Sequence, residues 1–571
     1  MSATREQALA TLTGPGGAFE IVPTDVQGIE MPVFRNAPPT MRAVFEQSLE
    51  FGDRTFLVYD DLRWTYADHG DRVRRLAHHL REMAGVRPGD RVAIGMRNYP
   101  EWVLAFWTTQ AIGAVAVPLN AWWTGSELEY GMSDSGAIAA IVDDERLDRM
   151  RPILEALPTA PIVARSRTTI PEWAVALDDI IEVDGEPPAL PHVDIAPDDP
   201  SAIMYTSGTT GLPKGAVQTH RNHCTNLTNT ALHGALTAEM AGPAEAPSSD
   251  DEPVSHTIAL QTFPFFHIGG LTGLYTSTAF GATLVTMYKW DATEAVRLVQ
   301  AEGVTAVSGV PTVVRQLLDE LDREGVVAPG LGSITSGGAP VPPHLIDRIG
   351  ERSGRAIRPG NGYGLTETTS AVVANMGPDY YDHPDSVGRP VPVAEVTIRD
   401  ELGNVLPDGQ RGELWVRGPN VVAGYWNKPE ATAEAFTDGW FHTGDAAYVR
   451  DGFVYVVDRI KDVVLRGGEN VYCAEVEAAI HAIDGVLDVA VVGLPHDVLG
   501  EEVAAVVEFA PGSDVTAADI QRRLASNLAA FKVPSIVIRS AEPLPRTATG
   551  KVLKRDLRSA LERPSATYER L

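Results

Sequence analysis

One stretch of the sequence has the residue types needed to bind a polyphosphate. It runs from Tyr205 to Gly215 and follows the apolar run Ala202-Ile203-Met204, which predicts a strand that ends in a turn. Glycines let a backbone turn tightly with its N–H groups pointing inward, hydroxyls add donors, and Lys214 adds a positive charge. Pro213 stands where a Walker loop has its second glycine. A flexible linker is the alternative, but a linker needs neither the strand nor the Pro-Lys-Gly exit. The predicted phosphate-binding residues are Thr206, Ser207, Gly208, Thr209, Thr210, Gly211 and Lys214.

A second polar stretch, from Asn361 to Glu367, has residue types suited to a base and a metal ion. Tyr363 stands between two glycines, so its ring could lie flat against a purine. Thr366 offers a hydroxyl to an α-phosphate, and Glu367 offers a carboxylate, which is a ligand that Mg²⁺ prefers. A plain loop that ends in a helix cap is the alternative. The predicted binding residues of this stretch are Asn361, Gly362, Tyr363, Thr366 and Glu367.

In this order the two stretches resemble the phosphate loop and the adenine and magnesium motif of the adenylate-forming superfamily. That superfamily includes acyl-CoA synthetases, peptide-synthetase adenylation domains and firefly-type luciferases. Further stretches resemble motifs of the same superfamily: Ser336–Pro340, Asp438–Asp445, Asp458–Asp462 and Pro543–Lys551. Together the motifs extend from Tyr205 to Lys551, and none lacks its key residue. The chain looks most like the acyl-CoA synthetase and fatty-acid–CoA ligase branch, which implies ATP, Mg²⁺ and coenzyme A as cofactors and co-substrates.

The resemblance implies roles for particular residues. Gly338 and Ala339 would line the adenine and the acyl group, and Asp445 would accept hydrogen bonds from both ribose hydroxyls. Arg459 would contact the nucleotide. Lys551 would reach both the carboxylate and the α-phosphate during acyl-AMP formation, although an exposed loop lysine taken alone is normally inert. The implied catalytic residues are Lys551, Thr366, Glu367 and His267.

The same resemblance implies a small C-terminal domain that rotates between two reaction steps, because the lysine and the incoming thiol need the same space. The hinge would fall at residues 458–461, with Lys461 at the hinge position of the family. After rotation, Gly467 and Gly468 would leave room for the pantetheine arm of coenzyme A. Cys473 stands where relatives often carry proline, and we interpret it as a packing residue.

The implied acyl pocket comprises Phe263–Gly270, Ser308–Thr312 and Gly337-Gly338. Amino-acid-activating relatives carry an aspartate in the first segment, whereas Pro264-Phe265 would leave an ammonium group unpaired at a cost. The segments contain no Lys or Arg to pair a second carboxylate. We therefore predict an apolar monocarboxylic acid, with a medium- or long-chain fatty acid favoured and an aryl acid as the alternative. His267 is a candidate gate of the pocket, and a structural histidine is the other interpretation.

These residues predict an enzyme, an AMP-forming acid–thiol ligase. We expect free coenzyme A as the acceptor, since no carrier-protein domain follows Lys551; a separate acyl carrier protein and a luciferase-like oxidative step stay open. A non-enzymatic nucleotide-binding scaffold would be expected to have lost Lys551, Glu367 or Lys214, and all three are present.

Composition limits the partners. The 571 residues carry a formal net charge of −29, with a pI near 4.8. This balance argues against a nucleic-acid surface, which needs a basic stripe, and against adhesion to anionic lipid. The N-terminus lacks the apolar core of a signal peptide. The most apolar run, Val103 to Leu119, is interrupted by polar residues and predicts a buried helix and strand rather than a transmembrane segment. We expect a cytoplasmic protein, and the oligomeric state, including a homodimer, stays open.

The two cysteines, Cys224 and Cys473, lie far apart and predict no disulfide framework, which fits a reduced compartment. His220, His223 and Cys224 form a short cluster without a second pair of ligands. We therefore predict no zinc site there.

The elements that must position the chemistry follow an α/β pattern. Strands and helices alternate up to Val142 and again from His256 to about Ala374, and short strands dominate from Ser386. We predict a large N-terminal domain, residues 1–457, made of two α/β layered subdomains with a largely parallel sheet and a small β-barrel-like subdomain. A hinge at 458–461 would lead to a small mobile α+β domain at 462–571. Residues 1–38 predict a packed arm, and residues 238–252 predict an exposed loop.

Overall fold

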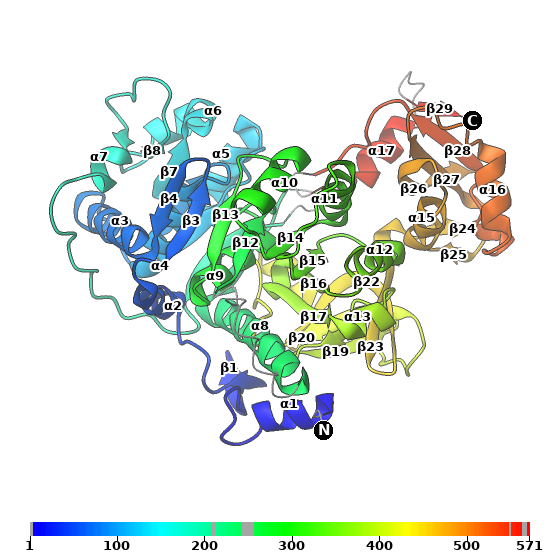
Figure 1. The fold of residues 1–571 in the computed structure, drawn as a ribbon, viewed down its shortest axis with the longest axis horizontal. Helices are drawn as coiled ribbons and strands as arrows, with labels where there is room; N and C mark the ends of the chain where they lie inside the picture. Colours follow the sequence, from blue (N-terminus) through cyan, green and yellow to red (C-terminus); the bar gives the residue numbers. More distant parts are fainter. Residues whose placement is uncertain (1–3, 207–211, 242–255, 548–549, 562–567, 571) are drawn as a thin grey trace.

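Two sheets, mostly parallel, form the body of the protein (Figure 1). The computed structural model describes residues 4–206, 212–241, 256–547, 550–561 and 568–570. The first sheet has the strand order β11 (Gly215–Thr219), β10 (Pro200–Tyr205), β6 (Val115–Pro118), β5 (Arg91–Gly95), β7 (Ala139–Asp143), β8 (Ile162–Ala164) and β9 (Val175–Ala176). Only β11 is antiparallel to its neighbour.

The second sheet has nine strands. Their order is β18 (Arg389–Pro390), β17 (Ser370–Met376), β16 (Arg358–Leu365), β15 (Ser333–Gly337), β14 (Ala306–Gly309), β12 (Ile258–Gln261), β13 (Thr283–Thr286), β3 (Thr55–Tyr59) and β4 (Leu62–Thr65). Strands β3 and β4 form a hairpin near residue 60. It joins the second sheet because β3 pairs in parallel with β13, more than two hundred residues later in the chain.

A single core joins residues of both sheets to the helices that pack against them. These helices are α2 (Met41–Ser48), α3 (Tyr66–His78), α4 (Pro100–Ala111) and α9 (Ile268–Ala279). Every residue of α4 is buried, and β6 follows it, so the apolar run from Val103 to Leu119 is a buried helix and strand as predicted. Among the described residues, no helix combines the length and the apolar character that crossing a membrane requires.

Local sequence signals explain where several helices begin and end. Thr65 caps α3 through a capping box with Asp68, and Pro100 occupies the first turn of α4. The remaining helices of the body are α1 (Arg5–Thr13), α5 (Gly125–Ser135), α6 (Asp144–Glu155), α7 (Asp178–Ile181), α8 (His220–Ala241), α10 (Ala292–Ala301), α11 (Pro311–Arg323), α12 (Pro343–Ser353) and α13 (Pro378–Asp382). The predicted N-terminal arm comprises α1 and the hairpin of β1 (Ile21–Val26) and β2 (Ile29–Phe34), with Phe34 packed against Leu232 of α8. The loop predicted at 238–252 lies largely outside the described residues.

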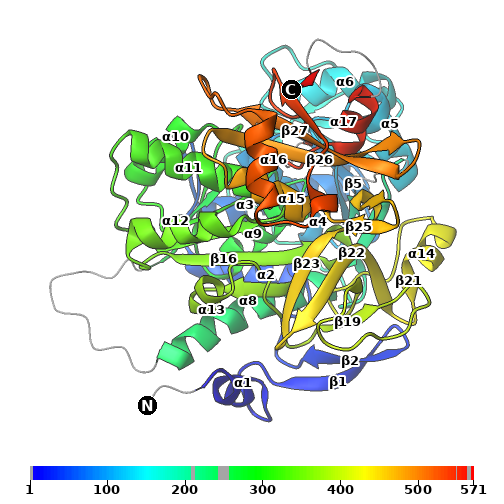
Figure 2. The same ribbon diagram turned by 90° about the vertical axis from the view of Figure 1, so that its right-hand side faces the viewer.

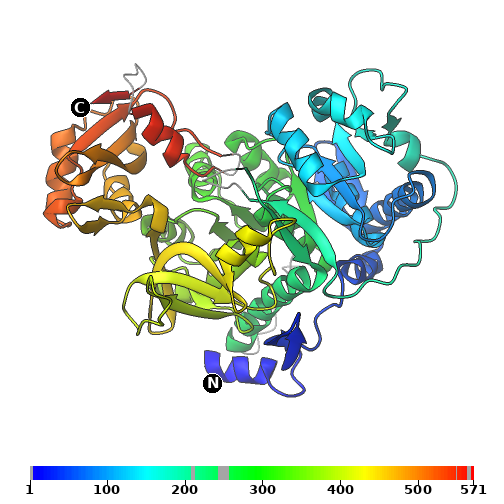
Figure 3. The same cartoon turned by 180° about the vertical axis from the view of Figure 1, so that it is seen from behind.

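A five-stranded antiparallel sheet forms the predicted β subdomain, drawn in yellow in Figure 3. It contains β19 (Glu395–Arg399), β20 (Gly412–Arg417), β21 (Phe436–Thr437), β22 (Trp440–Arg450) and β23 (Phe453–Arg459), with α14 (Pro429–Ala435) beside them. Its core includes Val372 and Val373 of β17, so the subdomain is fixed to the second sheet. The last strand, β23, continues to Arg459, and a short 3₁₀ turn at Ile460–Asp462 leads out of it.

The small C-terminal domain lies to one side of the body (Figures 1 and 2). It contains β24 (Val464–Arg466), β25 (Glu469–Val471), α15 (Cys473–His481), β26 (Val486–His496), β27 (Gly500–Phe509), α16 (Ala517–Ala525), β28 (Ile536–Ser540), α17 (Lys554–Leu561) and β29 (Tyr568–Arg570). Two clusters of buried side chains give it cores of its own. It is the α+β unit that the sequence predicts; its limits at 458–461 stay a prediction.

Candidate active site

The candidate site lies at one edge of the second sheet. Strands β12, β14, β15 and β16 are parallel neighbours, so their carboxyl ends lie along the same edge. The segments predicted to bind the acyl group and the adenine follow these ends directly. Ligands of open α/β sheets bind at this edge because the loops there are free to vary.

The described ends of the phosphate loop form a hairpin. Tyr205 of β10 pairs with Gly215 of β11, and the Thr206 N–H donates to the Lys214 carbonyl at 2.9 Å. Ser207, Gly208, Thr209, Thr210 and Gly211, which the sequence assigns to phosphate binding, lie outside the described residues. The Lys214 ammonium lies 4.3 Å from the centre of the Tyr425 ring, so a cation–π contact holds it beside the loop.

Glu367 lies on the other side of the same tyrosine. The Tyr425 hydroxyl donates to Glu367 Oε1 at 2.7 Å, and the Glu367 side chain is largely buried. Thr366 is fixed beside it, because Gln218 Nε2 donates to the Thr366 carbonyl at 2.8 Å. In the part of the chain that the structure describes, no hydrogen bond reaches the second oxygen of this carboxylate. Such a carboxylate suits Mg²⁺ bound together with phosphates, since this ion needs few protein ligands in such sites.

The predicted adenine and ribose residues meet at one carboxylate. The Tyr363 hydroxyl donates to Asp445 Oδ2 at 2.5 Å, and Arg459 Nε lies 2.6 Å from Asp445 Oδ1. Asp445 and Arg459 are opposite each other in the β22–β23 pair, which explains the contact. Burial raises the pKa of the Asp445 carboxyl, while Arg459 and Tyr363 act in the opposite direction. Asn361 and Gly362 precede Tyr363 on β16.

The glycine after Tyr363 has a structural reason of its own. A Cβ at Gly364 would overlap the Ser370 carbonyl of the neighbouring strand β17, and a Cβ at Gly362 would lie 3.2 Å from the Ala371 side chain. Ser370 itself has a φ of 79°, in the left-handed region. The glycines that the sequence analysis related to a bound purine therefore also permit the close approach of β17.

Lys551 reaches this edge from the small domain. Burial among protein groups lowers the pKa of its ammonium, and the Arg459 charge lowers it further, whereas Asp445 raises it. Although protein groups surround the ammonium, Lys551 as a whole residue remains exposed to solvent. The preceding residue touches the body directly, since a Cβ at Gly550 would lie 3.1 Å from Val310 Cγ2. The structure thus brings Gly550 to Val310 and places Lys551 within electrostatic range of Asp445 and Arg459.

The predicted acyl residues also meet. His267 stacks on Phe263, with ring centres 6.1 Å apart, and a Cβ at Gly338 would lie 3.7 Å from Phe263 and 3.8 Å from Val310. His267 caps α9, because its Nδ1 accepts from the Gly269 N–H at 3.2 Å, which leaves the proton of the neutral ring on Nε2. Burial, and then the Lys551 charge, lower the pKa of His267 to about 4. Ala339 follows Gly338 at the same strand end, and both remain accessible.

Gly467 and Gly468 lie elsewhere in this structure. They form the turn between β24 and β25, with φ values of 61° and 87°, and the Gly467 N–H donates to Leu499 of the same domain at 2.8 Å. Within the described residues, the only side-chain neighbour of a Cβ added at either glycine is Leu499. The structure does not bring them to the nucleotide residues.

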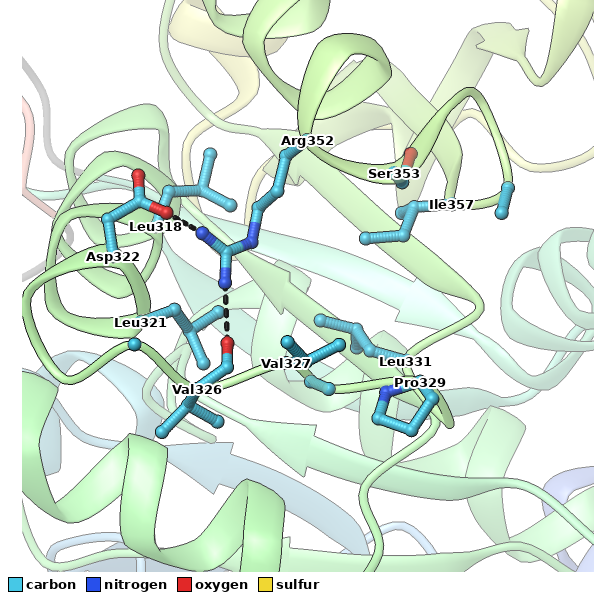
Figure 4. Close-up of a pocket in the computed structure, with 13 residues that line it drawn as sticks. Leu318, Leu321, Asp322, Val326, Val327, Pro329, Leu331, Arg352, Ser353 and Ile357 are labelled. Atoms are coloured by element: carbon cyan, nitrogen blue, oxygen red, sulfur yellow. Dashed lines mark hydrogen bonds and ion pairs between the residues drawn. The ribbon is translucent and has the colours of Figure 1, made fainter.

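A pocket of about 480 Å³ with mostly apolar lining residues lies away from the candidate site (Figure 4). It is lined by Leu318 and Leu321 of α11, by residues around Val327, and by Ile357, which precedes β16. These residues flank the amino ends of β15 and β16, at the opposite edge of the sheet. Arg352 is its main polar group, and it is engaged by Asp322 and by the Val326 carbonyl.

The predicted absence of a zinc site concerns residues at the start of α8. His220 Nδ1 accepts from the Met41 N–H at 3.1 Å, and Cys224 is buried, which raises the pKa of its thiol to about 12. Both cysteines are free and buried. In the part of the chain that the structure describes, no group of His, Cys, Asp or Glu has the arrangement of a metal site.

Residues that sequence analysis missed connect the predicted ones. Tyr425 joins Lys214 to Glu367, and Asp134 on α5 contacts Tyr205. Neither lies in a motif whose residue types predict chemistry. The aromatic run Tyr425-Trp426 is a weak signal at best, and Asp134 gives none.

A two-sheet α/β body, followed by a small α+β domain that returns a lysine to the strand ends, defines the class of adenylate-forming enzymes. The model of the family described as AMP-binding enzyme matches residues 44–426, and that of the AMP-binding enzyme C-terminal domain matches residues 475–551. The chain therefore belongs to the AMP-binding enzyme family.

Known proteins agree with this assignment along most of the chain. A feruloyl-CoA synthase of Amycolatopsis sp. is 37% identical over 496 residues, which cover 86% of this chain and 93% of the relative. The long-chain-fatty-acid–CoA ligase FadD13 of Mycobacterium tuberculosis is 34% identical over 515 residues, which cover 89% and 94%. The o-succinylbenzoate CoA synthetase MenE of Bacillus subtilis, solved with the acyl-adenylate intermediate OSB-AMP, has a TM-score of 0.76 and 27% identity over 92% and 98% of the two chains. The chain is an enzyme of the acid–thiol ligase type.

Proposed function

We propose that this enzyme is an ATP-dependent acyl-CoA synthetase that acts on an apolar monocarboxylic acid in the cytoplasm. In the first step, a carboxylate oxygen attacks the α-phosphorus of ATP, so that acyl-AMP forms and pyrophosphate leaves. In the second step, the thiol of coenzyme A attacks the acyl carbon, so that the thioester forms and AMP leaves with the electron pair of the broken bond. The favoured acid is a medium- or long-chain fatty acid.

The position of Lys551 carries the proposal. Its ammonium belongs to a separate domain, yet burial and the charge of this ammonium together lower the pKa of His267. In turn, burial and Arg459 lower the pKa of Lys551, and Asp445 raises it. A carboxylate and a triphosphate repel each other, and a cation between them offsets that repulsion most strongly in the transition state. This arrangement fits the first step.

The other predicted residues fit contacts with the nucleotide. Asp445 and Arg459 would hold the ribose, and Tyr363, Asn361, Gly362, Gly338 and Ala339 would surround the adenine. Glu367 would hold Mg²⁺, which supplies charge neutralisation at the phosphate oxygens when bound. Thr366 and the loop from Thr206 to Lys214 would bind the phosphates through hydroxyl, N–H and ammonium donors.

The second step needs another arrangement of the small domain. Gly467 and Gly468 lie away from the nucleotide residues here, and a rotation at 458–461 would exchange them with Lys551. A turn of two glycines without side chains suits the passage of a thin pantetheine arm. The contact of Gly550 with Val310 would be broken by the rotation.

The fatty acid and the aryl acid have different support. Phe263, Val310 and Gly338 meet around His267 and offer an apolar surface without a charged partner for the acid. The relative FadD13 is named for long-chain fatty acids, which favours the first class. The feruloyl-CoA synthase, at 37% identity, favours an aryl acid as the second candidate.

A panel of acids tests the proposal. The enzyme is mixed with ATP, Mg²⁺ and one acid from a series of short, medium and long fatty acids, benzoates and cinnamates, and pyrophosphate is measured; coenzyme A is then added and AMP is measured. We expect acid-dependent pyrophosphate release and AMP formation that depends on coenzyme A, fastest with medium or long fatty acids. Fastest turnover with a cinnamate would shift the assignment to aryl acids. No pyrophosphate with any acid would contradict the proposed function.

A further inference from the structure

Asp134, on helix α5, contacts the start of the phosphate loop directly and its end through Tyr130 of the same helix. The Tyr205 hydroxyl, where the loop begins, donates to Asp134 Oδ2 at 2.9 Å. Where the loop ends, the Tyr130 hydroxyl lies 3.0 Å from the Pro213 carbonyl and 3.3 Å from Asp134 Oδ1, and shares its single proton between them. The Lys428 ammonium lies 2.9 Å from the same Oδ1.

The carboxylate that receives these contacts is buried, whereas the Lys428 side chain is partly exposed. The Asp134 side chain is only 8% exposed, so its charge depends on the donors around it. The hydrogen bond to Asp134 is the main cause of the raised pKa of Lys428, so this ammonium is charged at neutral pH. Tyr205 fits against its neighbour because residue 215 is glycine; a Cβ there would lie 3.5 Å from the ring and 2.6 Å from Ile203.

The segment Tyr425–Lys428 connects Asp134 to the rest of the site. Trp426 Nε1 donates to the Asp134 carbonyl at 3.1 Å, and the Trp426 N–H donates to Gly215 at 2.7 Å. Its neighbour Tyr425 contacts both Lys214 and Glu367. Helix α5, the ends of the phosphate loop and the segment 425–428 therefore form one hydrogen-bonded unit, assembled from parts of the chain up to 292 residues apart.

We propose that Asp134 is a positioning residue for ATP: it holds Tyr205, Tyr130 and Lys428 so that both ends of the phosphate loop keep the spacing that the triphosphate requires. This inference rests on the proposed function. We call Asp134 with its partners Tyr205, Tyr130 and Lys428 the clamp. Loop ends that are already fixed lose less conformational freedom when the ligand binds, so the clamp acts on nucleotide affinity. Within the described residues, no hydrogen bond, ion pair or ring contact of the clamp reaches an acyl residue, so a variant of Asp134 should bind the acid as the parent does.

Direct binding of ATP and steady-state kinetics test the clamp with Asp134→Asn. The amide still accepts from Tyr205, but its NH₂ group faces the donors of Tyr130 and Lys428, so part of the clamp is lost. We expect the Kd and the KM for ATP to rise about tenfold, which corresponds to ~1.4 kcal/mol, with kcat and the KM of the acid within about threefold of the parent. Lys428→Met and Tyr205→Phe, which each remove one contact, should raise the KM for ATP about threefold.

Glu101→Gln is the matched control. Glu101 is 9% exposed and pairs with Arg165 at 2.8 Å, so its burial and ion pair resemble those of Asp134, and its partners lie outside the loop and the segment 425–428. We expect this variant to lose stability without a change in the KM for ATP.

Two results would overturn the inference. The first is ATP binding by Asp134→Asn equal to that of the parent. The second is a rise in the KM values of all substrates that Glu101→Gln also shows at the same loss in Tm. If Asp134→Asn fails to fold, unchanged ATP binding in both Lys428→Met and Tyr205→Phe would also overturn the inference. ATP binding is measured without acid, so the clamp can fail while the parent still makes acyl-CoA, and it can hold if no acid is a substrate.

Discussion

Arg459 Nε lies 2.6 Å from Asp445 Oδ1, across the antiparallel pairing of β22 with β23. The second oxygen of the same carboxylate accepts from Tyr363, so three residues predicted to hold the nucleoside already contact one another. Both carboxylate oxygens can accept further hydrogen bonds, because each has two lone pairs. A ribose would thus enter a group that is already oriented.

Asp445→Asn should weaken the recognition of the ribose hydroxyls. We expect the KM for ATP to rise about 30-fold, or ~2 kcal/mol, because the variant loses charge-assisted hydrogen bonds and leaves Arg459 without its partner. The informative comparison is with 2′-deoxy-ATP. The parent should discriminate against it about tenfold and the variant about twofold; equal discrimination by both would place the ribose elsewhere.

His267 should remain neutral throughout the working pH range. Burial and the Lys551 charge lower its pKa to about 4, so the His267 ring is uncharged in the folded protein at neutral pH. Because the folded pKa lies below the unfolded value near 6.5, the stability from this group is complete above pH 6.5 and is lost as the pH falls towards 4. NMR of ¹³C-labelled histidine, with His267→Asn for assignment, should show no titration of this ring between pH 5.5 and 8; a midpoint near 6.5 would contradict the geometry.

Gly364→Ala should destabilise the enzyme strongly. The added methyl would overlap the Ser370 carbonyl of β17, and backbone atoms cannot move aside as a flexible side chain can. We expect a loss of more than ~3 kcal/mol in the free energy of unfolding, measured by denaturant titration. Gly234→Ala is the control, since a Cβ there meets nothing within 4 Å in helix α8 and should add about 0.5–1 kcal/mol of stability. A Gly364→Ala variant as stable as the parent would show that β16 and β17 do not pair this closely.

Much of the architecture follows from local signals in the sequence. The alternation of strands and helices in the body and the α+β character of the small domain were predictable because apolar runs of limited length are separated by turn residues. The pairing of β3 with β13 was not, since the hairpin at 55–65 carries no information about which sheet it joins. Local patterns fix an element, whereas long-range packing decides its neighbours.

The candidate site shows the same division. Lys214 and Glu367 stand in stretches whose residue types suggest chemistry. Asp445 and Lys551 stand in stretches that resemble motifs of the superfamily, so the sequence indicates all four. Tyr425 and Asp134 act through contacts with residues far away in the chain, and no spacing reveals such contacts. Gly364 is a third case. The sequence shows the residue type, and the structure shows the reason for it, which is the close approach of the Ser370 carbonyl.

Lys461→Pro should separate the two reaction steps. Lys461 lies in the short 3₁₀ turn after β23, and the φ typical of a 3₁₀ turn, roughly −60°, is close to the fixed φ of proline. A rigid hinge would keep Lys551 at the nucleotide, so acyl-AMP formation should stay within about threefold of the parent. Thioester formation from acyl-AMP should slow by at least tenfold in a rapid-quench experiment. Lys461→Ala, which keeps the hinge flexible, should leave both steps near the parent rates.

The central claim is that Lys551, supplied by the small domain, stabilises the transition state of acyl-AMP formation. Single-turnover measurement of acyl-AMP synthesis by Lys551→Ala, alongside thioester formation from preformed acyl-AMP and coenzyme A, tests it most directly. We predict that the first rate falls by about 10²–10³-fold and the second changes less than threefold. Acyl-AMP synthesis at the parent rate in a folded Lys551→Ala enzyme would contradict the account.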